Sequence, residues 1–201
     1  MLSQFIDRQG VLKIKMGKEP DLFSALTRSI IYQQLSGKAA GTINGRFNAL
    51  FEGLYPDACS ASTMSMETLR SVGLSRNKAL AIQDLANKTI DGSLASMRRV
   101  AKLSDDEVIE NLVQVRGVGP WTAQMLLMFN LGRSDVMPAA DLGIQKGVQK
   151  VYCLNSLPGP DEVTTCTEHL APYRSAASWY FWRAAHTVLQ EPLKPVKKGA
   201  S

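Results

Sequence analysis

Asp141 and Trp121 are the two residues whose types and spacing most suggest chemistry in this chain. Asp141 lies twenty residues after Trp121, a separation that fits one helix and one returning loop, so both side chains could face one cleft. Asp is also a common helix N-cap, and the two roles are compatible because backbone N–H groups favour an ionised carboxylate. An ionised carboxylate can stabilise positive charge that develops on a reacting group.

Trp121 follows a glycine-containing turn with the sequence Val-Arg-Gly-Val-Gly-Pro. Ser104 and Glu107 predict a capping box at the start of a helix upstream of it, and the chain therefore reads helix, tight turn, helix. The amides of the turn would lie at the start of the second helix, where the helix dipole favours phosphate. This predicts an anion site at Arg116, Gly117, Val118 and Gly119. A plain helix stop is the alternative, since glycine is common past helix ends.

The composition fits one domain or two small helical lobes. The chain has 201 residues, of which 45% are hydrophobic, and its net charge is +5 at pH 7, with an isoelectric point of about 9.2. A basic excess suits a polyanionic partner. Cys59, Cys153 and Cys166 are far apart and odd in number, so we expect neither a disulfide framework nor an iron–sulfur cluster. We expect a reducing, intracellular setting, with no signal peptide or membrane span.

Helical periodicity dominates the sequence, and no segment alternates for long enough to predict a sheet. The expected helices cover residues 21–36, 38–51, 66–72, 75–90, 93–100, 104–114, 121–131, 141–151, 160–170 and about 171–191. The helix after the turn is apolar almost all round, which is typical of the centre of a bundle. We therefore predict an all-α fold. The remaining residues, 192–201, form a basic tail that we expect to be disordered.

These features resemble the helix-hairpin-helix (HhH-GPD) superfamily of DNA base-excision glycosylases, most of all its alkylated-base branch, the 3-methyladenine DNA glycosylases. The resemblance runs from about Asp21 to Trp182. Besides the hairpin and Asp141 it is carried by residues 30–40, 72–78 and 172–175. It implies two lobes with the active-site cleft between them: lobe 1 at about 23–137, a helical barrel containing the hairpin at 112–123, and lobe 2 at about 1–22 plus 138–191.

The resemblance also implies roles for residues at the active site. Asp141 matches the catalytic aspartate. Trp121 stands where the lyase members carry a nucleophilic lysine, and an indole cannot form a Schiff base. Trp182, Tyr180 and Met125 are the other candidates for the pocket of the damaged base. Aromatic residues are equally at home in a core, and Met125 replaces an aromatic residue of the family.

Further residues are implied to contact DNA. Gln34 is the candidate for insertion into the gap that an extruded nucleotide leaves, with Gln33 in a supporting contact and Ser36 at the minor groove. Solvated glutamines at a helix end are the alternative. The implied phosphate contacts are Arg116, Gly117, Val118, Gly119, Thr122 and Lys78. The family often holds a monovalent cation, sodium or potassium, on main-chain carbonyls that match Val113, Val115 and Val118.

The resulting expectation is a monofunctional DNA glycosylase that hydrolyses the N-glycosidic bond of alkylated purines in duplex DNA and lacks lyase activity. No cofactor is required. We expect a monomer that acts on damaged double-stranded DNA and does not bind membranes, in the cytoplasm or nucleoid of a prokaryote or the nucleus of a eukaryote. The alternatives are a non-catalytic hairpin module that binds distorted DNA and a lyase-type glycosylase for oxidised bases. The sequence does not rank 3-methyladenine, 7-methylguanine, ethenoadenine and hypoxanthine as substrates.

Overall fold

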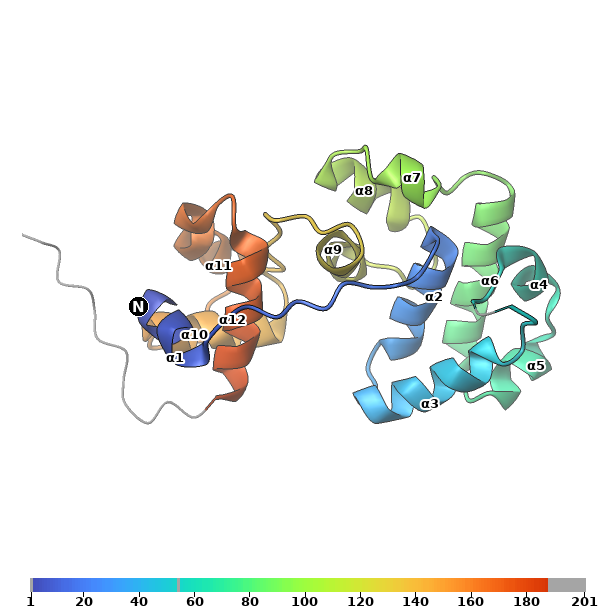
Figure 1. The fold of residues 1–201 in the computed structure, drawn as a ribbon, viewed down its shortest axis with the longest axis horizontal. Helices are drawn as coiled ribbons and strands as arrows, with labels where there is room; N and C mark the ends of the chain where they lie inside the picture. The colour runs from blue at the N-terminus through green and yellow to red at the C-terminus, as the bar shows by residue number, and fades with distance from the viewer. Residues whose placement is uncertain (1, 54, 188–201) are drawn as a thin grey trace, which may run out of the picture. The chain divides into compact units, whose positions relative to one another are not determined.

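The computed structural model describes residues 2–53 and 55–187, and within these residues the regular elements are helices (Figure 1). In chain order they are α1 (Leu2–Gln9), α2 (Leu22–Tyr32), α3 (Gly37–Asn48), α4 (Ala58–Thr63), α5 (Met66–Ser71), α6 (Arg76–Ile90), α7 (Met97–Val100), α8 (Asp105–Leu112), α9 (Pro120–Phe129), α10 (Leu142–Tyr152), α11 (Pro160–Thr167), the 3₁₀ turn η1 (Glu168–Leu170) and α12 (Arg174–His186). The all-α prediction is confirmed, and the predicted tail at 192–201 lies outside the described residues.

Most of the predicted helices begin and end inside the ranges expected from periodicity, because caps set their ends. The exceptions are α3 and α9, each of which begins one residue before its expected range, and α10, which ends one residue after its range. Ser65, Ser75, Ser96 and Ser104 each accept a hydrogen bond from the backbone three residues on, at the starts of α5, α6, α7 and α8. The serine at the start of α8 also forms the predicted capping box with Glu107. Two short helices, α1 and α4, were not predicted. Each is eight residues or fewer, too short for periodicity to be distinctive.

The chain divides into two compact units, each described by itself below. The hairpin unit is residues 16–131, and the terminal unit combines residues 1–15 with residues 132–201. The divisions at 15/16 and 131/132 differ from the expected lobe boundaries near 22 and 137 because hydrogen bonds hold the connecting segments. The Gly17 amide donates to the Phe129 carbonyl at 2.7 Å, and Asn130 Nδ2 donates to Glu19 Oε2 at 3.1 Å.

Hydrogen bonds also hold the start of the terminal unit's second segment, which begins at residue 132, to α12. The Ser175 amide donates to the Ser134 carbonyl at 2.9 Å, and the Val136 amide donates to Ser175 Oγ at 2.9 Å. Arg174 binds both carboxylate oxygens of Asp135, with Nε to Oδ1 at 2.7 Å and Nη2 to Oδ2 at 2.9 Å. Residues 133–136 therefore belong to the terminal unit.

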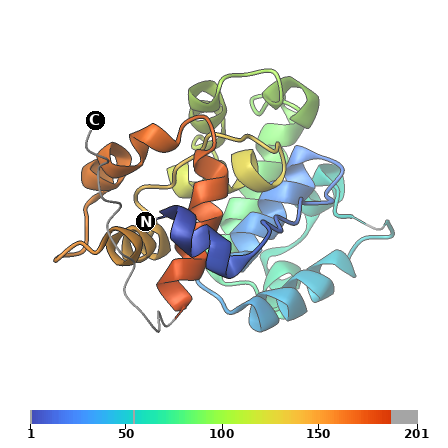
Figure 2. The ribbon, with the colours of Figure 1, turned by 60° about the vertical axis from the view of Figure 1, so that its left-hand side comes forward.

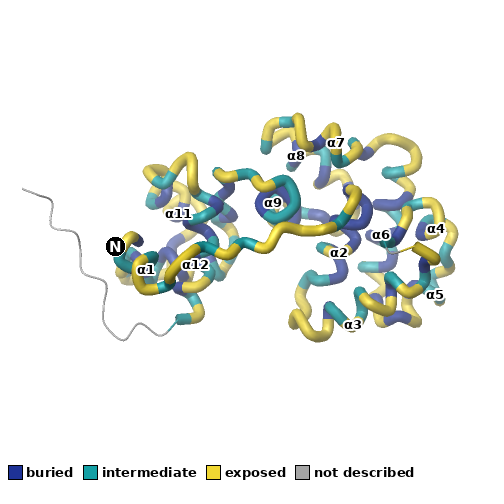
Figure 3. Tube along the Cα trace, in the orientation of Figure 1, coloured by how far each residue is buried: buried dark blue, intermediate teal, exposed yellow. Residues whose placement is uncertain are grey.

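The core of the hairpin unit forms around α2, α6 and α9. Its fully buried side chains include Leu26, Ile30, Ile31, Phe47, Leu69, Ile82, Leu85, Leu112, Leu126 and Leu127. After its first two residues, which are exposed, α9 presents only buried or half-buried residues (Figure 3), as its apolar sequence predicts. This central helix fixes the hairpin that precedes it.

The core of the terminal unit forms where α10 packs on α12, with α1 against both (Figure 2). Its buried residues are Leu2, Phe5, Ile144, Val148, Val151, Val163, Ala177, Tyr180, Phe181 and Ala184. A Cβ at Gly147 would lie within van der Waals overlap of the Phe181 carbonyl oxygen. The two helices therefore approach as closely as they do only because α10 has a glycine at this position.

None of the helices in the described part of the chain combines the length and the apolar character that a membrane span needs.

Candidate functional site

The predicted hairpin forms between α8 and α9. The Val115 amide donates to the Leu112 carbonyl at 3.1 Å, and the Val118 amide donates to the Val115 carbonyl at 3.0 Å. Gly117 has φ +74°, a left-handed conformation that glycine adopts without steric cost. Pro120 occupies the first turn of α9, where its missing N–H would have had no helical partner.

Three of the predicted phosphate contacts have other partners in the hairpin unit. The Val118 amide is used inside the turn. The Thr122 side chain is 3% exposed, and its hydroxyl accepts a hydrogen bond from Gln33 Nε2 at 3.2 Å. The Lys78 ammonium donates to two backbone carbonyls of the chain itself. The phosphate prediction therefore keeps the exposed Arg116 side chain and the amides of Gly117 and Gly119.

Helix α6 also binds the hairpin turn. Asp84 Oδ2 accepts the Arg116 amide at 2.8 Å, and Asp84 Oδ1 accepts Lys88 Nζ at 2.7 Å. Burial alone would raise the pKa of this carboxyl, but the two hydrogen bonds and the charges of Lys88 and Arg116 outweigh it and lower the pKa. Asp84 was not predicted, because nothing in the sequence links it to a residue 32 positions later.

Trp121 lies in the first turn of α9 with 43% of its surface exposed in the hairpin unit. This exposure disfavours the alternative that the indole is a core residue, because tryptophan is usually well buried. Met125, one turn further on, is half-buried.

Asp141 is the N-cap of α10, as predicted, and it has a second partner on another helix. Its Oδ1 accepts the Ile144 amide at 2.9 Å and Trp182 Nε1 at 2.8 Å. Charge-assisted hydrogen bonds of this kind stabilise a carboxylate and fix its direction. The structure therefore brings together two residues that sequence reasoning had assigned to the site separately.

Gly143 makes the contact between Asp141 and Trp182 possible. A Cβ at this position would lie 2.8 Å from Trp182 Cδ1 and 2.9 Å from Asp141 Oδ1. Any larger side chain would have to displace the indole or the carboxylate. The sequence contained one signal for it, since Gly143 and Gly147 lie four residues apart and so share a face of α10.

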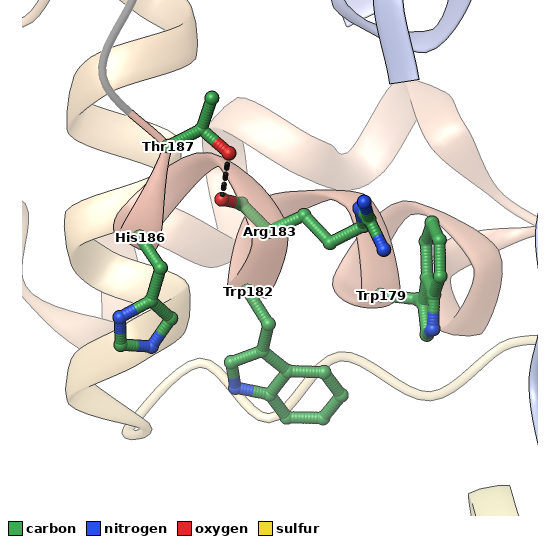
Figure 4. Close-up of a pocket in the computed structure, with 5 residues that line it drawn as sticks. All are labelled: Trp179, Trp182, Arg183, His186 and Thr187. Carbon is green, nitrogen blue, oxygen red and sulfur yellow. Dashed lines mark hydrogen bonds between the residues drawn. The ribbon is translucent and has the colours of Figure 1, made fainter. Parts of the chain in front are cut away.

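The aromatic residues of α12 separate into two groups. Tyr180 is 6% exposed, and its hydroxyl donates to the Gly10 carbonyl at 2.9 Å. It is a core residue, and the prediction that it lines a base pocket is corrected. Trp182 is half-buried and, with Trp179, Arg183 and two further residues, lines a shallow pocket of about 400 Å³ (Figure 4). Here the Arg183 guanidinium lies 4.7 Å from the centre of the Trp179 ring, and Trp182 points elsewhere.

The residues predicted to enter the DNA and its minor groove lie in the turn between α2 and α3, and we call residues 33–36 the wedge segment. Gln33 Nε2 donates to the Gly117 carbonyl at 3.0 Å as well as to Thr122, so the segment is bonded directly to the hairpin. Gln34 is exposed and left-handed, with φ +55°. Ser36 is the N-cap of α3 and accepts the Ala39 amide at 3.3 Å.

Within the described residues no group of three or more His, Cys, Asp or Glu side chains could hold a metal ion. The main-chain carbonyls that match the family's monovalent cation ligands are those of Val113, Val115 and Val118, which lie within six consecutive residues. Carbonyl oxygens are donors of the kind that hard cations prefer. The Val115 carbonyl already accepts the Val118 amide, which leaves one of its two lone pairs for an ion. The donor set therefore fits such a cation.

The comparisons with known proteins agree with this geometry. Residues 27–172 match the model of the HhH-GPD superfamily of base excision DNA repair proteins. The match includes the wedge segment, the hairpin and Asp141. The chain belongs to the HhH-GPD superfamily.

Three matches define the branch. DNA-3-methyladenine glycosylase 1 of Schizosaccharomyces pombe is 38% identical over 181 residues, which cover 90% of this chain and 78% of that protein. The solved structure of the Schizosaccharomyces pombe 3-methyladenine DNA glycosylase Mag1 in complex with abasic DNA matches with a TM-score of 0.82 and 34% identity, over 92% of this chain and 91% of that one. A DNA-3-methyladenine glycosidase from Bacillus halodurans also matches with a TM-score of 0.82 and 34% identity, over 92% and 84% of the two chains. Within the superfamily, the chain falls in the alkylated-base glycosylase branch.

Proposed function

We propose that this protein is a DNA glycosylase that releases alkylated purines of the 3-methyladenine type from duplex DNA, as the opening step of base excision repair. The observation that carries the proposal is the Asp141 carboxylate, held at the start of α10 by the Ile144 amide and the Trp182 indole. Relatives of similar length are named for this activity. The activity places the protein where DNA is: the cytoplasm or nucleoid of a prokaryote, or the nucleus of a eukaryote.

Asp141 acts on the sugar of the extruded nucleotide. The bond between C1′ and the base nitrogen lengthens and its electron pair leaves with the base, so positive charge develops on the sugar. The fixed carboxylate stabilises this charge, and it orients and deprotonates the water that attacks C1′. An alkylated purine is already cationic and departs as a neutral base. The reaction therefore needs no strong general acid.

Trp121 determines whether water or an amine of the protein attacks C1′, which are the two chemistries of the superfamily. Its indole has no amine that could attack C1′, so water is the nucleophile and the DNA strand is left intact. An exposed indole face also attracts a cationic base by stacking and by a cation–π interaction. Borohydride, which traps a Schiff base between enzyme and DNA, is expected to give no cross-link.

The hairpin holds a DNA phosphate through the Gly117 and Gly119 amides and the Arg116 side chain. The carbonyls of Val113, Val115 and Val118 are the ligands that we propose for a monovalent cation. When bound there, the cation supplies positive charge toward a phosphate. Gln34 fills the space left by the extruded nucleotide.

The test is to incubate the protein with methylated duplex DNA and to identify the free bases by chromatography. Release of 3-methyladenine from intact strands is the expected result. Tight binding to the same duplex without release of any base would overturn the proposal and would favour a non-catalytic module. A borohydride-trapped complex would instead favour a lyase.

A further inference from the structure

The turn that follows α2 contains a residue in a costly conformation. Gln34 has φ +55°, and among the described residues Cys153 is the one other residue besides glycine with a positive φ. A left-handed conformation costs roughly 1 kcal/mol or more for a residue with a Cβ and persists when neighbouring groups hold it.

Lys78, in the first turn of α6, binds the turn directly. Its Nζ donates to the Ile31 carbonyl at 2.8 Å and to the Gln33 carbonyl at 2.7 Å. Carbonyls at the end of a helix have no helical partner of their own, so the ammonium acts as a cap of α2. Lys78 is half-buried, and burial lowers the pKa of its ammonium.

The same helix also holds the hairpin. Asp84, six residues after Lys78, accepts the Arg116 amide. A Cβ at Gly117 would lie 3.5 Å from the Cβ of Ala81, which is an ordinary contact distance. The Gln33 side chain closes the arrangement by donating to the Gly117 carbonyl and to Thr122. Helix α6 therefore supports both the wedge segment and the hairpin.

We propose that Lys78 is a positioning residue, whose ammonium binds the two carbonyls at the end of α2 and thereby holds Gln34 in the left-handed conformation in which it enters the DNA stack. The proposal rests on the proposed function, because it concerns the base-extrusion step of that reaction. It replaces the expectation that Lys78 contacts a phosphate, since two of its three N–H donors are committed within the protein.

Two variants separate the roles. Lys78→Met removes the ammonium and keeps most of the aliphatic stem. Lys78→Arg keeps the charge but replaces a compact ammonium with a planar fork. Arginine serves well as a phosphate contact, but its guanidinium is larger than an ammonium and planar, so we expect it to displace the two carbonyls that Lys78 Nζ binds. Lys102→Met is the matched control, because Lys102 is exposed and lies between α7 and α8, outside the wedge segment, α6 and the hairpin.

Three measurements are made on the full-length protein: the single-turnover rate of base release, the fluorescence of 2-aminopurine placed beside the lesion as a probe of extrusion, and the salt dependence of binding to undamaged duplex. We expect both Lys78 variants to lose release and extrusion by roughly 10- to 100-fold, with an unchanged salt slope. Lys102→Met is expected to match the wild type.

The failures are distinguishable. If wild type releases no base, the proposed function fails, and the extrusion signal alone then decides the role of Lys78. Wild-type extrusion in both variants would overturn the positioning role. A salt slope reduced by about 0.9 in Lys78→Met, with Lys78→Arg near wild type, would show a phosphate contact instead. Should Lys78→Met fail to fold, Lys78→Arg makes the same distinction.

Discussion

The indole N–H of Trp182 donates to Oδ1 of Asp141 at 2.8 Å, across 41 residues of sequence. This bond connects the start of α10 to the middle of α12, and the two helices form the core of the terminal unit. The direction of the Asp141 carboxylate, to which we assign the catalytic role by proposal, is therefore coupled to the packing of this core. Substitutions that leave Asp141 in place but disturb α12 are expected to affect catalysis.

Asp141→Asn is expected to lower the rate of base release at least about 100-fold while binding to duplex DNA persists. Asparagine is as good an N-cap as aspartate, and its amide oxygen can still accept from Ile144 and Trp182. The variant thus keeps the fold and loses the negative charge. Single-turnover release from methylated DNA and a binding isotherm measure the two effects.

The control for charge is Asp161→Asn. Asp161 is an exposed acidic residue in the first turn of α11, and we expect this variant to retain the wild-type rate. Full activity of Asp141→Asn would remove Asp141 from the mechanism.

Gly143→Ala is expected to slow base release by up to about 100-fold, which a displacement of about 1 Å in an active site can cost. The added Cβ would press on both Trp182 and Asp141. The unfolding free energy is expected to change little, because alanine favours the helix by about 1 kcal/mol and so offsets part of the strain. Release kinetics and the NMR signal of the Trp182 indole N–H report the two consequences.

Gly45→Ala is the matched control for Gly143→Ala. Gly45 lies inside α3, where nothing stands within 4 Å of an added Cβ. We expect it to stabilise the protein slightly without changing activity. An unmoved indole signal together with wild-type release in Gly143→Ala would contradict the positioning of Asp141 by Trp182.

The sequence predicts local features of this fold better than contacts between distant segments. The capping box at Ser104, the hairpin and the N-cap at Asp141 all depend on residues within four positions of one another, and the structure contains each of them. Ser-initiated helices are predictable for the same reason. The short helices α1 and α4 were missed because they are stabilised by packing rather than by a distinctive pattern.

Contacts between residues far apart in the sequence could not be predicted. An exposed phosphate-binding lysine and a lysine that caps a neighbouring helix have the same local sequence, so the partners of Lys78 at Ile31 and Gln33 could not be read from it. Tyr180 was misassigned for a related reason. Helical spacing shows that some aromatic residues of α12 face inward, but not which of them reach the core.

The ion pair between Asp135 and Arg174 is expected to make the unfolding free energy depend on pH. The side-chain hydrogen bond from Arg174 is the main cause that lowers the pKa of Asp135 below its ordinary value of 3.8, against a smaller opposing effect of burial. A carboxyl group whose pKa is lowered in the folded state stabilises the protein at pH values above its unfolded-state pKa. This stabilisation is lost as the pH falls through the folded-state pKa. Asp135→Asn is thus expected to be less stable than wild type by about 1 kcal/mol near neutral pH.

The difference between Asp135→Asn and wild type should close as the pH falls below about 4. Urea denaturation at pH 6 and pH 3 measures it, with Asp161→Asn as a variant that removes an exposed carboxylate. A gap that stays constant between these two pH values would show that the ion pair does not contribute through its charge.

Trp121→Ala is expected to discriminate between cationic and neutral damaged bases. Loss of stacking costs about 1–3 kcal/mol for any base, and a cationic base additionally loses a cation–π contribution of about 0.5–2 kcal/mol. The kcat/KM for release of 7-methylguanine or 3-methyladenine should therefore fall further than that for release of neutral hypoxanthine. Ile90→Ala, which truncates another exposed apolar residue of the hairpin unit, is expected to alter neither. Equal losses for both classes of base would indicate that the indole serves by shape alone, and that selectivity for charge arises from the leaving group rather than from the pocket.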